Sequence, residues 1–144
     1  MKAEKKIKIT FKIDPKLENF GLEKVYLLKN FIKYCISYLD IKSESIQVNL
    51  KNGKDKHLQT LASYGYSQDS NEPDNIYIRA GGRHIVDIMR SIAHEIVHKR
   101  QNERNELTDD SGHTGSAQEN EANSLAGVIM RDYTKLKPEI LDII

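Results

Sequence analysis

Residues 84–101 read HIVDIMRSIAHEIVHKRQ, and this stretch decides the fold class that the sequence predicts. Its large apolar residues recur three and four positions apart, which is the spacing of one face of an α-helix. They are Ile85, Ile88, Met89, Ile92, Ile96 and Val97. A second amphipathic helix follows, and the segments with strand patterns come before. The sequence therefore predicts an α+β fold, in which a small mixed sheet of about four strands and a backing helix precede these two helices.

Four segments upstream of these helices show strand patterns, because apolar residues alternate with polar ones or form short runs between turn signals. They are residues 7–13, 46–50, 58–66 and 75–80. Asn52-Gly53 is a turn dipeptide that would fold the second strand back onto the third.

A long amphipathic helix is expected between the first two strands. Asp14-Pro15 supplies a helix-start signal, and the apolar stripe runs to the neighbourhood of Asp40. Cys35, the single cysteine of the chain, lies on this stripe. Burial in an apolar core raises the pKa of a thiol and suppresses its reactivity, so we expect Cys35 to be a packing residue rather than a nucleophile.

The length of 144 residues suits one domain, residues 1–144. Within it we expect the sheet and backing helix in residues 1–82, the two later helices in residues 83–135 and a hydrophobic tail in residues 136–144. The composition, 38% hydrophobic and 30% charged with a net charge of +1, indicates a globular chain with neither a nucleic-acid nor a membrane partner. One cysteine and the lack of a signal-peptide pattern predict a cytoplasmic location.

Residues 94–98 read HEIVH, which is the H-E-x-x-H pattern. Two histidines four positions apart lie one turn above each other on one helix face, so His94 and His98 can bind a single Zn²⁺. Glu95 is offset by about 100° around the helix, from where it can reach a zinc-activated water without binding the metal itself. The sequence therefore predicts a zinc site with Glu95 as the general base.

A catalytic zinc site needs a third protein ligand, and the candidates are His113, Glu119 and Glu121. Glu119 completes a capping box that starts at Ser116 (SAQE), so its side chain is expected to bond back to the amide of Ser116. Glu121 lies at the edge of the apolar face of the last helix, so we expect it to point inward and bind the zinc. His113, in the preceding loop, is assigned as a donor to a developing oxyanion.

HEIVH followed about twenty residues later by Asn120-Glu121-Ala122 resembles the gluzincin pattern of zinc metallopeptidases. The chain is similar to minimal members of that clan, namely minigluzincins, ImmA/IrrE-like peptidases and above all small phage-encoded metallopeptidases, over residues 75–133. A phage-encoded protein of this kind would act in the host cytoplasm or in the virion.

The resemblance implies that His94, His98 and Glu121 bind zinc and that Glu95 is the general base. It also implies that the strand at residues 75–80 is an edge strand that pairs with an extended peptide substrate.

Two positions depart from the family pattern. Lys99-Arg100 stands where these peptidases have an uncharged and then an apolar residue, so we expect the helix to reach the surface soon after His98. Thermolysin-like gluzincins also carry an aspartate four residues after the ligand glutamate, which orients the first histidine. Counted from Glu121, this position is Leu125.

The sequence thus predicts a zinc-dependent metallopeptidase that acts on a peptide or protein, and it leaves the oligomeric state open. Two alternatives are a zinc-binding structural or interaction module without turnover, and a regulatory protease that cuts one partner such as a repressor or a virion precursor. The apolar residues of the tail are expected to be buried, either in the core or as a plug in the substrate cleft. They are Ile140, Leu141, Ile143 and Ile144.

Overall fold

The computed structural model describes residues 7–18, 20–53, 60–66, 72–108 and 115–142. The elements follow the chain in the order β1 (Lys8–Ile13), α1 (Leu22–Leu39), β2 (Ser45–Lys51), β3 (Ala62–Gly65), β4 (Asp74–Arg79), α2 (Ile85–Glu103), α3 (Ala117–Leu136) and the 3₁₀ turn η1 (Pro138–Asp142). The predicted α+β class with a four-stranded mixed sheet is confirmed. In the part of the chain that the structure describes, no helix is long and apolar enough to cross a membrane.

The strands lie in the order β1-β2-β4-β3, with β1, β2 and β4 parallel and β3 antiparallel to β4. The expected hairpin between the second and third strands is wrong, because β4 pairs with β2 and separates it from β3. Ile76 and Ile78 lie in register with Val48 and Leu50, and all four side chains are buried, which favours this pairing. The edge strand expected at residues 75–80 is therefore an inner strand, and β3 lies at the edge.

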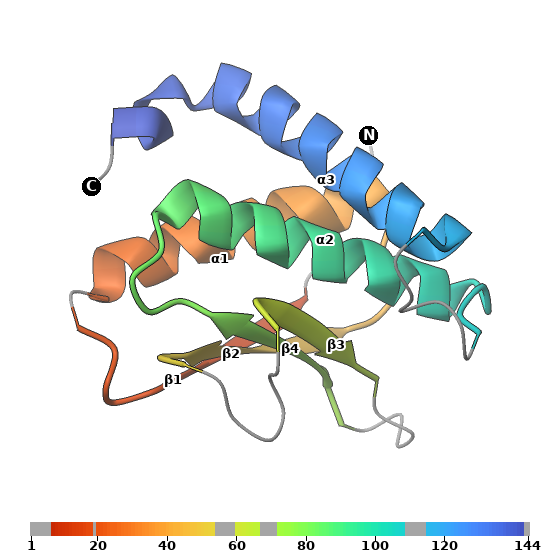
Figure 1. Ribbon diagram of the computed structural model, residues 1–144, viewed down its shortest axis with the longest axis horizontal. Coiled ribbons are helices and arrows are strands. Elements are labelled where there is room, and N and C mark those ends of the chain that lie inside the picture. Colours follow the sequence, from red (N-terminus) through yellow and green to blue (C-terminus); the bar gives the residue numbers. More distant parts are fainter. Residues whose placement is uncertain (1–6, 19, 54–59, 67–71, 109–114, 143–144) are drawn as a thin grey trace.

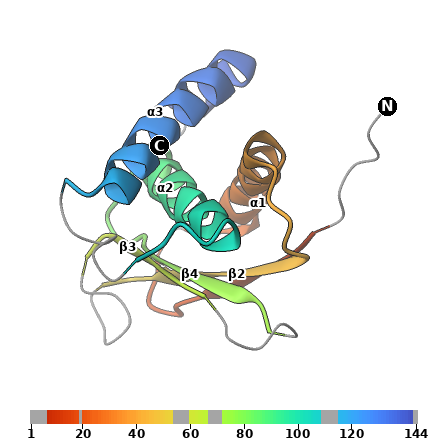
Figure 2. The same ribbon diagram turned by 90° about the vertical axis from the view of Figure 1, so that its right-hand side faces the viewer.

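The three α-helices lie on one face of the sheet (Figure 1, Figure 2). α1 and α2 pack on the sheet, and α3 packs mainly on α2. α2 is thus the central helix, and its residues Ile88, Ile92 and Ile96 are buried. Cys35 of α1 is fully buried in the same core, as predicted, and burial raises the pKa of its thiol.

The first helix starts later than the sequence predicts. α1 begins at Leu22, after Gly21, whereas the carboxylate of Asp14 accepts the backbone N–H groups of Lys16 (2.9 Å) and Asn52 (3.2 Å). These bonds lower the pKa of Asp14, and they use the side chain that was expected to cap the helix. The end of α1 is as predicted, since Asp40 follows it in the left-handed conformation with φ 52°.

α2 does not reach the surface after His98, contrary to expectation. Lys99 is only 1% exposed, and its Nζ lies 2.6 Å from Oδ2 of Asp74 at the start of β4. The last residue of α2, Glu103, accepts the backbone N–H groups of Lys42 (2.8 Å) and Ser43 (3.0 Å) in the connection from α1 to β2. The C-terminal half of α2 is therefore fixed to the sheet and to that connection.

The hydrophobic tail is buried only in part. Ile140 in η1 is 2% exposed and belongs to the core, while Leu141 beside it is 58% exposed. Ile143 and Ile144 lie outside the described residues. η1 packs at the C-terminal end of α3, the end opposite Glu119, so residues 138–142 contribute to the core and do not plug a cleft at Glu119.

Candidate metal centre

His94 and His98 lie one turn apart on α2, as the H-E-x-x-H spacing predicts. Their Nε2 atoms point to the same place and are 3.1 Å apart. Burial lowers the pKa of His94, and His98 adds to this effect while Glu119 opposes it. Both imidazoles are thus brought together by local helix geometry, before any ligand from another element is considered.

The carboxylate that faces the two histidines belongs to Glu119 in the first turn of α3. Its Oε1 lies 2.8 Å from Nε2 of His94, and its Oε2 lies 3.2 Å from Nε2 of His98. Half of the expected capping box exists, because Oγ of Ser116 accepts the backbone N–H of Glu119 at 3.1 Å. The other half is wrong, since the Glu119 side chain turns toward the histidines of α2 rather than back to Ser116.

The assignment of Glu121 as third ligand is corrected by this arrangement. Glu121 is two residues beyond Glu119, which is about 200° around the helix, so both cannot face the histidines. Its Oε1 instead accepts a hydrogen bond from Nε2 of Gln101 at 2.9 Å, and its Oε2 lies 4.0 Å from Nη2 of Arg100. The group of described side chains that could hold a metal ion is therefore His94, His98 and Glu119, whose ligand atoms lie within 4.8 Å of one another.

Each histidine also has a partner outside the group of His94, His98 and Glu119. Nδ1 of His98 lies 2.8 Å from Oε1 of Gln101, and His94 is hydrogen-bonded to the side chain of Asn123. Asn123 stands four residues after Glu119, which is the position that holds an aspartate in thermolysin-like gluzincins. Counted from Glu119, the position is therefore Asn123 and not Leu125.

Sequence reasoning missed Gln101. This residue has no exposed surface, and its amide nitrogen donates to the backbone carbonyl of Gln118 and to Glu121, both at 2.9 Å. The available signal was its position three residues after His98, which places it on the same face of α2.

The hydrogen bonds of these partners determine whether lone pairs or N–H groups face the centre of the site. The amide nitrogen of Gln101 is already a donor twice, so its Oε1 accepts from Nδ1–H of His98, and Nε2 of a neutral His98 carries a lone pair. Oδ1 of Asn123 accepting in the same way from His94 would leave a lone pair on Nε2 of His94 as well. The Nε2 lone pairs of both histidines and the carboxylate of Glu119 would then face one another, with no hydrogen-bond donor among these three groups. Their separations of 2.8–3.2 Å are near the roughly 3.3 Å expected around a tetrahedral zinc with bonds of 2.0–2.1 Å. The donor set could therefore hold a metal ion, and zinc is one ion that fits it.

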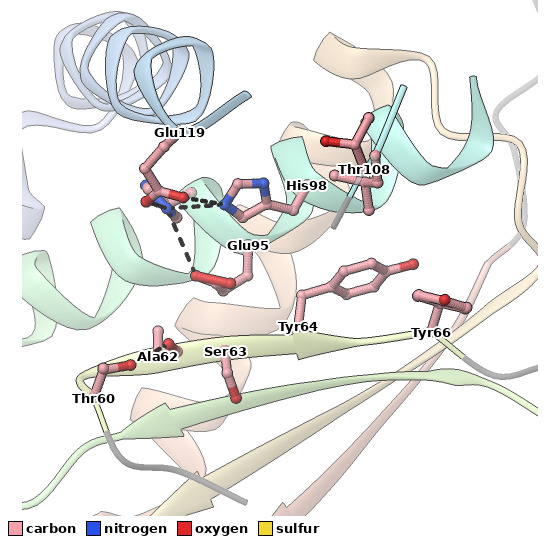
Figure 3. A pocket seen from close by; sticks show the side chains of 11 residues that line it. Thr60, Ala62, Ser63, Tyr64, Tyr66, Glu95, His98, Thr108 and Glu119 are labelled. Atoms are coloured by element: carbon pink, nitrogen blue, oxygen red, sulfur yellow. Dashed lines mark hydrogen bonds and ion pairs between the residues drawn. The ribbon is translucent and has the colours of Figure 1, made fainter. Parts of the chain in front are cut away.

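A cavity of about 540 Å³ opens beside the three side chains and is lined on its other wall by β3 (Figure 3). Glu95 faces this cavity, and its Oε2 lies 3.9 Å from Nε2 of His94. The side chain is almost completely buried. Burial, and secondarily the charge of Glu119, raise the pKa of Glu95 to about 8.

Comparisons with protein-family models, curated proteins and solved structures found no match. The site is consequently defined by its own geometry. That geometry brings together three of the residues singled out in the sequence analysis, namely His94, Glu95 and His98, and it places Glu119 where Glu121 was expected. His113 lies outside the described residues.

Proposed function

We propose that this protein is a zinc-dependent metallopeptidase that cleaves internal peptide bonds. The observation that supports this is the convergence of His94, His98 and Glu119 on one point of a cavity that Glu95 also lines. Two imidazoles and one carboxylate form a donor set that zinc commonly takes in catalytic sites, where one coordination position stays open. The position of Glu95, next to the metal-binding group but outside it, suits a general base.

His94, His98 and Glu119 would hold the zinc ion, which would supply a Lewis acid able to activate water near neutral pH and to polarise a carbonyl group. A cation beside Glu95 would favour the ionised form of its carboxyl group, and this carboxylate would take the proton of the attacking water and then transfer it to the nitrogen of the departing amine. Gln101 and Asn123 hold the imidazole rings with Nε2 facing the metal position.

An extended peptide is the substrate that the cavity wall favours. β3 is the edge strand of the sheet, and it forms the wall opposite Glu95 (Figure 3). A peptide that lies along an edge strand gains main-chain hydrogen bonds whatever its sequence. This moves the substrate-binding role from β4, where the resemblance implied it, to β3.

A gluzincin-like assignment remains our proposal, with Glu119 as the ligand glutamate. Support comes from Asn123, which contacts His94 from the position where the family has an aspartate. We also propose the cytoplasm as the location, since the single buried cysteine requires no oxidising compartment.

Zinc content and casein hydrolysis test the proposal together. Purified protein should carry close to one zinc per chain, and Glu119→Gln should lose it while the matched variant Glu121→Gln retains it. Glu95→Gln should retain zinc and lose hydrolysis by several orders of magnitude, because the side chain keeps its size but cannot accept a proton. Wild-type protein that binds zinc but cleaves no casein would point instead to a zinc module without turnover. Comparable zinc loss in both glutamate variants would contradict the ligand set.

A further inference from the structure

Two cavities meet at Glu95 and His94. The larger one, of about 540 Å³, extends along β3 toward Tyr66, and the smaller one, of about 370 Å³, lies around Leu61. Both are lined by Glu95, by His94, by Thr60 just before β3 and by Ala62, the first residue of β3. Figure 3 shows Thr60 and Tyr66 at opposite ends of this strand, with Glu95 above the stretch between them. A peptide that lies along β3 would therefore place its two halves in different cavities.

The two cavities differ in chemistry. The larger one has the rings of Tyr64 and Tyr66 and the side chain of Leu107 in its wall, and no lysine or arginine lines it among the described residues. The smaller one contains Arg90, together with Ser91 and Asn123. The substrate side chains that would fit are accordingly apolar or aromatic in the larger cavity and anionic in the smaller one.

Arg90 is available for a ligand, whereas the neighbouring Arg83 is not. Arg83 donates to the backbone carbonyls of Arg79 (2.8 Å) and Asp87 (3.0 Å) and to Oγ of Ser91 (2.7 Å). Arg90 lies one turn before His94 on α2, and no carboxylate among the described residues forms an ion pair with it. A guanidinium in a cavity wall that forms no ion pair within the described part of the chain is suited to bind a carboxylate in two parallel hydrogen bonds.

We infer that the smaller cavity binds a carboxylate of the peptide substrate through Arg90, on the C-terminal side of the bond that is cleaved. This inference rests on the proposed peptidase function. The carboxylate is either an aspartate or glutamate side chain or the free C-terminus of the peptide, because both present the same group to a guanidinium.

The direction in which the peptide runs along β3 follows from the geometry of strand pairing. Antiparallel pairing is the more stable arrangement per residue, and β3 runs from Ala62 to Gly65. A peptide antiparallel to β3 runs from the Tyr66 end to the Thr60 end, so the residues after the cleaved bond lie near Thr60. That is the end at which Arg90 lines the cavity.

The test uses fluorescein-labelled octapeptides with a central Phe-Leu bond and an amidated C-terminus. One pair carries Asp or Asn at the second position after that bond, and a second pair carries Asp or Asn two positions before it. A third pair, shortened to end at the second position after the bond, has Asn there with a free or an amidated carboxyl group. Binding is measured by fluorescence polarisation on the zinc-loaded Glu95→Gln protein, and kcat/KM is measured on the protein with Glu95 intact.

The expected result is about fivefold tighter binding of the downstream Asp peptide, or of the free carboxylate, than of its neutral counterpart. Arg90→Gln removes this preference, while Arg131→Gln, which changes an exposed arginine of α3, preserves it. A preference confined to the Asp pair assigns the ligand to a side chain, and one confined to the free carboxylate assigns it to a chain terminus.

Equal binding within every pair, or a preference that persists in Arg90→Gln, overturns the inference, and a preference for the upstream Asp peptide overturns its direction. The two proposals fail separately. Zinc- and Glu95-dependent hydrolysis without any Arg90-dependent preference refutes only the carboxylate site. An Arg90-dependent preference without hydrolysis by the Glu95-intact protein refutes only the peptidase function.

Discussion

Nδ1 of His98 lies 2.8 Å from Oε1 of Gln101, a side chain with no exposed surface one turn further along the same helix. Gln101 is held in turn by Gln118 and Glu121 from α3. The orientation of one histidine of the proposed metal site therefore depends on how α3 docks on α2. This relationship gives Glu121 a role, because it positions Gln101 and does not itself reach the metal-binding group.

Replacing Gln101 should weaken zinc binding. Gln101→Leu keeps a similar volume but removes the acceptor for Nδ1–H of His98, and we expect a 10- to 100-fold lower zinc affinity in competition with a chelating dye. The control is Gln118→Leu, whose side chain donates to the carbonyl of Glu106 and should leave the affinity within about twofold. Unfolding of the metal-free proteins shows whether the fold is intact. Equal affinities in both variants would contradict a positioning role for Gln101.

Glu95 should make the metal-free protein less stable as the pH rises. Its pKa is about 8 in the folded state and near 4.5 in the unfolded chain, so between these values the folded state binds more protons. The stabilisation is complete below about pH 4.5 and is lost as the pH rises through about 8, with a slope of at most roughly 1.4 kcal/mol per pH unit. The measurement is urea unfolding of wild type and Glu95→Gln in chelator from pH 5 to 8.5. If the free energy of unfolding changed with pH in the same way for both proteins, the burial of Glu95 would not be the cause of the loss in stability.

Lys99 should contribute far more to stability than an exposed lysine in a similar pair. Lys99→Met leaves Asp74 without its buried cation, and we expect a loss of roughly 3–5 kcal/mol in the free energy of unfolding. Lys42→Met breaks the exposed pair with Asp40 at 2.9 Å and should lose less than about 1 kcal/mol. The double variant Lys99→Met/Asp74→Asn should recover most of the loss. Similar losses for Lys99→Met and Lys42→Met would show that the buried pair is unimportant.

The two neighbouring apolar residues of the tail should behave differently. Ile140→Ala removes a buried side chain and should lower the free energy of unfolding by about 2–4 kcal/mol, as cavity-forming substitutions do. Leu141→Ala changes an exposed side chain and should stay within about 0.5 kcal/mol. Denaturant unfolding of both variants checks this. A rise in hydrolysis on either substitution would instead indicate that the tail restrains the active site.

Structural features that are determined within one helix could be predicted from the sequence. The pairing of His94 with His98 follows from helix periodicity, and Ser116 was correctly identified as the residue that starts α3. The side chain of Glu119 was not predictable in the same way, because two partners compete for it. One is the amide of Ser116 in its own helix, and the other is the pair of histidines on α2. Only the rotation of α3 against α2 decides between them.

Long-range contacts account for the other errors. Two consecutive basic residues after His98 indicated that the helix reaches the solvent there. Lys99 is nevertheless buried, because its Nζ donates to Asp74, 25 residues earlier in the chain. The turn dipeptide Asn52-Gly53 suggested a hairpin, but the apolar side chains of β4 match those of β2 and displace β3 to the edge. Each error comes from a local signal that a distant partner overrides.

The bonds that Lys99 and Glu103 make to Asp74, Lys42 and Ser43 fix the C-terminal half of α2 to the sheet and to the connection from α1 to β2 before any ligand arrives. A preorganised wall loses little conformational entropy when a peptide binds, so nearly all of the entropy loss falls on the peptide. Affinity for this cleft should consequently rise when a peptide is locked in an extended shape by cyclisation, even though such a ligand makes no additional contact.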